Sequence, residues 1–178
     1  MSDFLWRVLA AIASLSTNWL IRRAQRRPYT HILSPDGKDV YMWRGWLFNP
    51  YEAQYRKPGL WRKLPSVRLH HIMQPDQDRH CHDHPWDART IILRGWYAEA
   101  RLKFYPGETP GEILRVNVAG DTATLKRGEF HRIERVSPGG VWTLFITWKY
   151  QGSWGFYTEH GKVHHRVYLD ARTNKPAK

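Results

Sequence analysis

The sequence predicts an all-β protein, an antiparallel barrel or jelly roll that follows one N-terminal helix. From about residue 30 the chain consists of short runs rich in Val, Ile, Tyr, Trp and Thr. Turn signals punctuate these runs at 35–37 (Pro-Asp-Gly), 58–59 and 106–107 (Pro-Gly) and 138–140 (Pro-Gly-Gly). No helical pattern lies between the runs, although parallel βαβ units would need one. We therefore expect an antiparallel sheet that closes on itself.

Residues 4–21 are expected to form the helix. Its apolar residues recur at spacings of three or four, which places on one side Leu5, Leu9, Ile12, Leu15 and Trp19. Arg7 and the polar stretch 14–18 interrupt the apolar run, so no transmembrane span is expected. The positive charge lies mainly after the run, whereas a secretory signal carries it at the start. We expect the helix to pack on the barrel or in a homodimer contact, with docking on anionic lipid as the alternative.

Strands are expected at 39–48, 66–73, 88–104, 112–117, 121–126, 130–136, 141–149 and 153–157. With 178 residues, of which 42% are hydrophobic, the chain suits one domain with a hydrophobic core. The predicted organisation is an amphipathic helix and basic segment at 1–29, a barrel at 30–170 and a disordered polar tail at 171–178.

The densest group of chemically active side chains is the run Arg-His-Cys-His-Asp-His-Pro-Trp at 79–86. In an extended chain, residues two apart point to the same side, so His82 and His84 converge while Asp83 points away. Pro85 lacks an N–H and would end a strand, which places the pair near the mouth of the barrel. Two imidazoles that converge in this way are typical of a metal site.

A third ligand should come from a distant strand. His131 fits this role, because Gly128 provides a turn just before it. Three neutral imidazoles suit a divalent metal ion, with Fe(II) favoured and Zn, Ni, Co or Mn as alternatives. Glu129 lies two residues before His131 and can share its inward face, as a catalytic base, a fourth ligand or a charge at the rim.

These motifs resemble those of the cupin superfamily, in which His-x-His is followed by an acidic residue and a glycine, and a second motif reads Gly-x-x-His. Gly95 and the run 128–131 match this pattern. The chain is similar in particular to bacterial and phage cupin-like proteins with a His-Asp-His-Pro-Trp motif, here 82–86, followed by Leu-Arg-Gly at 93–95 and His-Arg-Ile-Glu at 131–134. The resemblance covers about residues 67 to 157 and implies a cupin-type double-stranded β-helix that holds a metal, without implying a particular reaction.

One departure from the cupin pattern leaves a second register open. The cupin motif usually supplies a glutamate after the second histidine, whereas the nearest acidic residue here is Asp87. If His80 and His82 were the ligand pair, Asp87 would fall near the acidic position and His84 would lie outside the site. In the preferred register, with ligands at 82, 84 and 131, Asp87 is expected beside the ligands as a catalytic partner.

Other residues of the motif region are left out of the ligand set. Cys81 alternates with the expected ligands and should face away, so a thiolate ligand is not expected. His70 and His71 are expected to be structural. Because Cys81 is the single cysteine, no intramolecular disulfide can form, and a cytoplasmic location is expected.

Three kinds of function remain open. The first is a non-haem Fe(II) oxygenase that acts on a small polar molecule, and the second is a metal-dependent sugar isomerase or epimerase. Basic side chains that could hold a phosphate or carboxylate are Arg89, Arg94, Lys126 and Arg132, although exposed cations are the simpler interpretation. The third is a non-catalytic module that binds a ligand or nucleic acid, since a formal charge of +12 attracts polyanions and anionic surfaces.

Overall fold

The computed structural model describes residues 2–26, 29–34, 37–50, 63–148, 150 and 152–173. The turn expected at 58–59, the first two residues of the turn at 35–37 and the tail from residue 174 lie outside these residues. The described helices are α1 (Asp3–Leu15), α2 (Thr17–Gln25) and α3 (His165–Thr173). The described strands are β1 (Tyr29–Leu33), β2 (Val40–Phe48), β3 (Ser66–Ile72), β4 (Asp87–Arg94), β5 (Trp96–Lys103), β6 (Gly111–Val118), β7 (Thr122–Leu125), β8 (His131–Val136), β9 (Val141–Trp148), β10 (Gly155–Thr158) and β11 (Gly161–His164).

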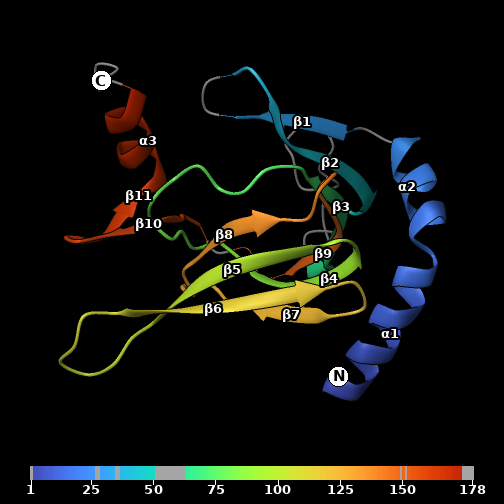
Figure 1. Ribbon diagram of the computed structural model, residues 1–178, viewed down its shortest axis with the longest axis horizontal. Helices are drawn as coiled ribbons and strands as arrows, with labels where there is room; N and C mark the ends of the chain where they lie inside the picture. Colours follow the sequence, from blue (N-terminus) through green and yellow to red (C-terminus); the bar gives the residue numbers. More distant parts are fainter. Residues whose placement is uncertain are drawn as a thin grey trace.

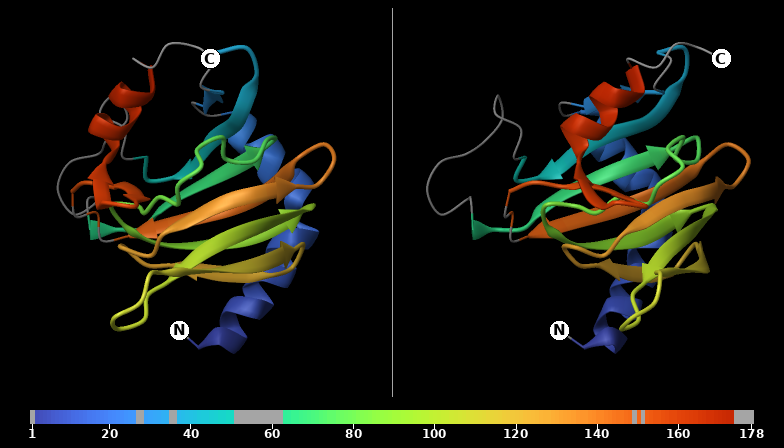
Figure 2. Two further views of the ribbon diagram at one scale, coloured as in Figure 1. Left: turned by 60° about the vertical axis from the view of Figure 1, so that its left-hand side comes forward. Right: turned by 90° about the vertical axis from the view of Figure 1, so that its left-hand side faces the viewer.

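The described strands pair antiparallel throughout, as the sequence predicts. One sheet has the strand order β1-β2-β3-β9-β4-β7, a second has the order β6-β5-β8, and β10 and β11 form a hairpin. Figures 1 and 2 show the two larger sheets folded around a common interior, with α1 and α2 along one side and α3 on the opposite side. The all-β class with an N-terminal helical segment is therefore confirmed.

The single strand expected at 88–104 is wrong, because the chain turns at Gly95 and forms two strands, β4 and β5. Gly95 has a φ of +80°, which a side chain would disfavour, and a Cβ there would lie 2.4 Å from Ser137 Oγ. The turn sends β4 into the large sheet and β5 into the small one. Apolar and aromatic residues occur in both strands, so the composition of the run does not mark the break.

Three elements were not expected from the sequence. β1 pairs with β2, β11 pairs with β10, and α3 follows β11 directly. The barrel expected to extend to residue 170 therefore gives way to a helix at His165, and this helix continues through Thr173 into the segment expected to be disordered.

The single helix expected at 4–21 is also wrong, because the chain bends by 71° between α1 and α2. Contacts with the end of β4 lie at the bend. Thr17 Oγ1 donates a hydrogen bond to Ser14 O (2.6 Å) and lies 3.2 Å from Leu93 O, and Arg94 Nη2 donates one to Asn18 Oδ1 (2.7 Å). Among the described residues no helix by itself is long and apolar enough to cross a membrane, and only α1 and α2 taken together meet that criterion.

The helices pack on the outer face of the large sheet through small residues. Ala10 and Ala24 are fully buried there and lie in one cluster with Trp43, Leu69 and Ile91. The apolar stripe identified in the sequence lies on the other side of the helices. Its members remain between 42% (Leu9) and 90% (Leu15) exposed.

A second apolar cluster fills one part of the barrel interior. Its buried members come from both sheets: Met42, Ile72, Ile92, Tyr97, Ile133 and Val141. His70 and Arg68 lie two and four residues before Ile72 along β3, and both are buried as well. The interior therefore changes from apolar to polar along β3, and the histidine site lies toward the polar part.

Candidate metal centre

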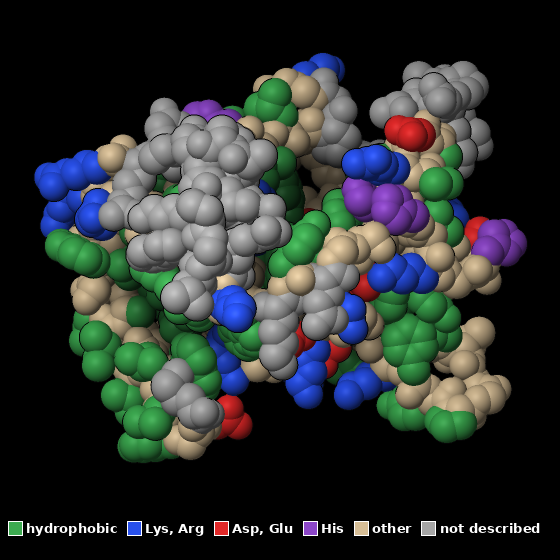
Figure 3. Space-filling view, turned by 180° about the vertical axis from the view of Figure 1, so that it is seen from behind, with side chains coloured by type: hydrophobic (Ala, Val, Ile, Leu, Met, Phe, Trp, Pro, Cys, Tyr) green, Lys and Arg blue, Asp and Glu red, His purple; other side chains and the backbone are tan. Residues whose placement is uncertain are grey.

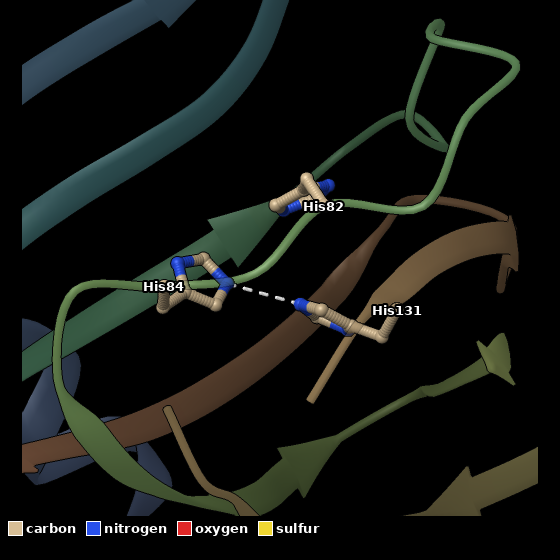
Figure 4. Close-up of side chains that lie close together, drawn as sticks. All are labelled: His82, His84 and His131. Carbon is tan, nitrogen blue, oxygen red and sulfur yellow. Dashed lines mark hydrogen bonds between the residues drawn. The ribbon is translucent and has the colours of Figure 1, made fainter. Parts of the chain in front are cut away.

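The three histidines expected as ligands come together in the structure, although they are far apart in the sequence (Figure 4). His82 lies in the extended segment between β3 and β4, and His131 is the first residue of β8. Their backbones pair directly, because His82 N donates to His131 O (2.8 Å) and His131 N donates to His82 O (2.9 Å). This reciprocal pair fixes the two motifs against each other.

The spacing of the rings fits a metal ion. One ligand atom from each of His82, His84 and His131 lies within 4.8 Å of the others. The Nε2 atoms of His84 and His131 are 3.0 Å apart. Two nitrogens bound at about 2.1 Å and at right angles to one another would be about 3.0 Å apart. The three residues could therefore hold a divalent ion, and the same contact is a hydrogen bond between two imidazoles when no ion bridges them.

Glu99 decides which nitrogen of His131 faces the other histidines. Its side chain is 1% exposed, and Oε2 lies 3.1 Å from His131 Nδ1. A carboxylate only accepts hydrogen bonds, so Nδ1 carries the proton and Nε2 keeps its lone pair for a metal. Arg101 and Asn117 donate to the other oxygen, Oε1, so both oxygens of the buried carboxylate have donors.

Sequence reasoning missed Glu99. The available signal was its position in β5 between Tyr97 and Arg101, two residues away on either side. Residues two apart in a strand share one side, and a carboxylate on the side that faces the interior requires a partner. The strand pairing that supplies the partner, with Arg101 opposite His131, is visible only in the structure.

Asp83 points away from the site, as the alternation predicts. Its side chain is fully buried, and Oδ1 accepts a hydrogen bond from Gly155 N at 2.8 Å. Oδ2 forms an ion pair with Lys162 on β11. These contacts fasten the segment between His82 and His84 to the β10–β11 hairpin.

Aromatic rings enclose the histidine rings. Trp86 stacks on His84 with ring centroids 5.5 Å apart and forms a wall of the site. Trp154 and Phe156 contact His82 at 5.9 and 5.8 Å. The apolar surroundings leave the His82 and His131 side chains only 17% and 12% exposed.

Burial keeps two of the three histidines, His82 and His84, neutral. Desolvation lowers the pKa of His82 to about 4, although the nearby Asp76 opposes the shift. The pKa of His84 is held well below its usual value, first by burial and then by the neighbouring His82 and His131. A metal binds the unprotonated imidazole, so the site favours the form that a metal requires.

The structure places the two expected catalytic carboxylates outside this cluster. Asp87 Oδ1 accepts a hydrogen bond from Arg127 N at 3.1 Å. Glu129 is 44% exposed, and its Oε2 accepts from Lys126 N at 2.9 Å. Among the described residues the group that could hold a metal contains neither of them. Their catalytic roles stay predictions.

The alternative register receives no support from the geometry. His80 lies outside the cluster, and its Nδ1 makes a hydrogen bond to the Tyr168 hydroxyl of α3 (2.9 Å). Cys81 faces away from the ligands, as expected, and is buried with Ala100 and Phe130. Desolvation raises the pKa of its thiol to about 12. The preferred register, with His84 as a ligand, is the one that the structure brings together.

The basic residues that the sequence suggested for anion binding have partners elsewhere. Arg89 lies over the ring of Trp6 on α1, and Arg94 bonds to α2. Arg132 pairs with Glu134, and Lys126 is exposed. A different arginine, which the sequence pattern did not indicate, is buried near the site.

That cation is Arg68, which is 2% exposed. Its guanidinium carbon lies 5.1 Å from the ring centroid of Trp86 and 5.0 Å from that of Phe145. Both rings contact His84, at 5.5 and 6.4 Å. Arg68 also contributes to the lowered pKa of His84, which places its positive charge within electrostatic reach of the site.

Comparison with known proteins extends the likeness at the level of fold. No family model and no curated protein matches the chain. Oxalate decarboxylase from Bacillus subtilis superimposes with a TM-score of 0.52 and 10% identity, over 86% of this chain and 33% of that one. A cupin-2 domain protein from Rhodospirillum rubrum matches with a TM-score of 0.49 and 12% identity over 81% of each chain. Fe(II) HppE with substrate matches with a TM-score of 0.46 and 12% identity, over 70% of this chain and 58% of that one.

The shared property is the arrangement of strands. At 10% identity the match to oxalate decarboxylase concerns the fold alone, and this chain spans about a third of that protein's length. The antiparallel sheets, the described strand order and this match agree with the expectation from the two histidine motifs. The chain has a cupin fold with a histidine triad that could bind a metal ion.

Proposed function

We propose that this chain is a metal-dependent enzyme, an Fe(II) oxygenase that acts on a small polar molecule. The observation that carries the proposal is the donor set, which among the described residues consists of three imidazoles and no carboxylate. Three protein ligands leave coordination positions open, and neutral ligands leave the full charge of a divalent ion to be balanced by a substrate. Such a site favours a substrate that itself supplies oxygen ligands.

The protein's own residues have distinct tasks in this proposal. His131 is oriented by Glu99 through Nδ1, so that Nε2 can serve as a ligand. His82 is held by the backbone pair with β8. The rings around the site limit the access of water. A bound Fe(II) would supply redox chemistry, whereas a redox-silent ion would supply only polarisation of a carbonyl group.

The charge near the site supports an anionic substrate. Arg68 is buried behind the rings of Trp86 and Phe145, and the carboxylate of Glu99 accepts hydrogen bonds from Arg101 and His131. The guanidinium of Arg68 therefore lies within electrostatic reach of His84. A carboxylate or phosphate group on the substrate would complement it.

A Lewis-acid isomerase or epimerase is the second candidate. The observation in its favour is the same all-nitrogen donor set, since three imidazoles also suit zinc, nickel, cobalt and manganese. The two candidates differ in the metal that they need. An oxygenase requires iron and consumes dioxygen, whereas an isomerase works with a redox-silent ion.

Elemental analysis of the purified protein tests the proposal. The sample is compared with a His82→Ala/His131→Ala double variant and with a His160→Ala/His164→Ala control, in which the replaced histidines are exposed and lie outside the cluster. We expect close to one equivalent of metal in the wild type and the control, and none in the site variant. Oxygen uptake by the iron-loaded protein with small carboxylates then tests the oxygenase.

The outcomes separate the candidates. Iron together with substrate-dependent oxygen uptake supports the oxygenase, and activity with zinc or manganese in the absence of dioxygen supports the isomerase. Equal metal content in the site variant and the wild type would remove the basis for both.

A further inference from the structure

The side of the N-terminal helices that faces away from the barrel carries large apolar side chains. We call them the N-terminal apolar face, and its members are Phe4, Leu5, Val8, Leu9, Ile12, Leu15 and Trp19. Their exposed fractions range from 40% (Val8) to 90% (Leu15). In Figure 3, hydrophobic side chains gather along the left edge, where the N-terminal helices lie in that view. A contiguous apolar surface of this kind indicates a binding surface.

Packing on the barrel does not use this face. The helices contact the large sheet through the fully buried Ala10 and Ala24 and through the partly buried Trp6 and Ala13. A helix with its small residues inward and its large apolar residues outward has its principal apolar side directed at another partner. Within the described part of the chain, that side stays exposed.

The same helices are basic. Arg7, Arg22 and Arg26 are exposed beside the apolar face, and Arg23 is half-buried. Asp3 is the single acidic residue among residues 1–29, and its carboxylate lies 3.5 Å from Arg89 Nη2. A second copy of this chain on the same face would bring arginines against arginines with almost no carboxylate to match them. An anionic lipid layer complements both the apolar and the basic side chains.

The dimensions of α1 favour docking parallel to a bilayer. α1 has 13 residues and is therefore about 20 Å long, whereas the hydrocarbon core of a bilayer is about 30 Å thick. The bend of 71° before α2 also breaks a continuous span. Trp19 lies on α2 after this bend, and indole rings prefer the interface between hydrocarbon and water.

We propose that the chain docks on an anionic membrane surface through the N-terminal apolar face, with Arg7, Arg22 and Arg26 against the lipid headgroups. The helices would then lie between the membrane and the barrel, with their small residues packed on the large sheet and their large apolar residues in the lipid. This inference is independent of the metal site, because it uses none of the histidine ligands.

Vesicle sedimentation with the full chain tests the proposal. The probes are vesicles of phosphatidylcholine alone and of phosphatidylcholine mixed with phosphatidylglycerol. The disrupting variant is Leu9→Asp/Ile12→Asp. The matched control is Leu114→Asp/Val116→Asp on β6, where the replaced side chains are at least as exposed (64% and 59% against 42% and 56%).

We expect the wild type and the β6 control to bind the anionic vesicles and the Leu9→Asp/Ile12→Asp variant to bind at least about tenfold more weakly. An Arg22→Gln/Arg26→Gln variant should lose about fivefold for each arginine, and added salt should weaken the binding of the wild type. Circular dichroism verifies that each variant is folded.

Two results would overturn the proposal. One is equal vesicle binding by the Leu9→Asp/Ile12→Asp variant and the β6 control. The other is a wild type that does not bind vesicles and that light scattering shows as a dimer, with the apolar-face variant as a monomer, since a second copy would then cover the face.

Discussion

At the scale of single residues, the candidate metal centre depends on a proton held on one nitrogen. Glu99 accepts a hydrogen bond from the Nδ1–H group of His131, and the Nε2 atom of His131 faces His84. Carboxylates that orient a metal-binding histidine raise its basicity and fix its tautomer. The ligand geometry is thus determined by a residue that does not itself belong to the group of possible ligands.

Replacing Glu99 with glutamine should weaken metal binding by about 10- to 100-fold, because a neutral amide oxygen accepts the hydrogen bond from His131 Nδ1 less strongly than a carboxylate does. The affinity can be measured by competition with a coloured chelator, and urea unfolding measures stability in parallel. Glu112→Gln is the control, since Glu112 is 49% exposed and contacts Arg132. If the Glu99→Gln variant bound metal as tightly as the wild type but were less stable, Glu99 would contribute to stability and not to metal binding.

His70 gives a prediction for the dependence of stability on pH. Its side chain is 6% exposed, and burial, helped by Arg68 and Arg44, holds its pKa well below 6.5. In the unfolded chain the imidazole takes up a proton as the pH falls below about 6.5, whereas in the folded protein it stays neutral. The unfolded state therefore binds more protons, and stability is lost as the pH falls from 6.5, by up to about 1.4 kcal/mol per pH unit.

The variant His70→Phe removes this contribution and keeps a ring against Phe145, on which His70 stacks with centroids 5.0 Å apart. We expect its free energy of unfolding to fall less steeply between pH 6.5 and pH 5 than that of the wild type. His160→Gln, at an exposed position, provides the comparison. Parallel pH profiles for wild type and His70→Phe in urea titrations would contradict the assignment.

At the scale of elements, the β10–β11 hairpin supports the histidine pair from outside. Gly155 N donates to Asp83 Oδ1, and Lys162 on β11 pairs with the other oxygen. The hairpin thereby holds Asp83, the buried residue between His82 and His84, in place. α3 also reaches this region through the hydrogen bond between Tyr168 and His80.

Gly155→Ala should destabilise the protein by roughly 1–3 kcal/mol, because the added Cβ would lie 2.1 Å from Val163 O across the hairpin. Metal affinity should fall together with stability, because the hydrogen bond from Gly155 N to Asp83, the residue between His82 and His84, would be displaced. Gly111→Ala is the matched control, as nothing lies within 4 Å of its Cβ. Urea unfolding measures both variants, and equal stabilities would show that the hairpin accommodates the methyl group.

At the scale of the whole molecule, the histidine cluster joins segments that are distant in sequence. His82 and His84 precede β4 in the large sheet, and His131 begins β8 in the small one. An ion bound to all three ligands would connect the two sheets. Binding to the folded state alone stabilises that state by mass action.

Metal at about 100 times its dissociation constant should add about 2.7 kcal/mol and raise Tm by roughly 5–10 °C for a domain of this size. Calorimetry of chelator-treated protein, with and without added Fe(II) or Zn²⁺, measures the shift. The His82→Ala/His131→Ala variant should show no such rise. The same rise in both proteins would mean that the ion binds elsewhere.

The sequence by itself determined the β class and the three histidines that come together as possible ligands. Alternation in an extended chain is a local property, so His82 and His84 on one side and Asp83 on the other follow directly from their order. The turn at Gly128, with a φ of +81°, lies three residues before His131, so it is likewise part of a local pattern. The direction of Cys81, away from the histidine rings, follows from the same local pattern.

The tertiary structure alone decided the strand break at Gly95, the bend between α1 and α2, the contact of Glu99 with His131 and the outward direction of the N-terminal apolar face. Periodicity shows which side chains share one side of an element, but it does not show which neighbour that side meets. Glu99 reaches His131 only because β5 pairs with β8. At the bend, Arg94 at the end of β4 donates a hydrogen bond to Asn18 on α2, and Thr17 Oγ1 lies 3.2 Å from Leu93 O. These outcomes depend on contacts between residues distant in sequence, which no local pattern contains.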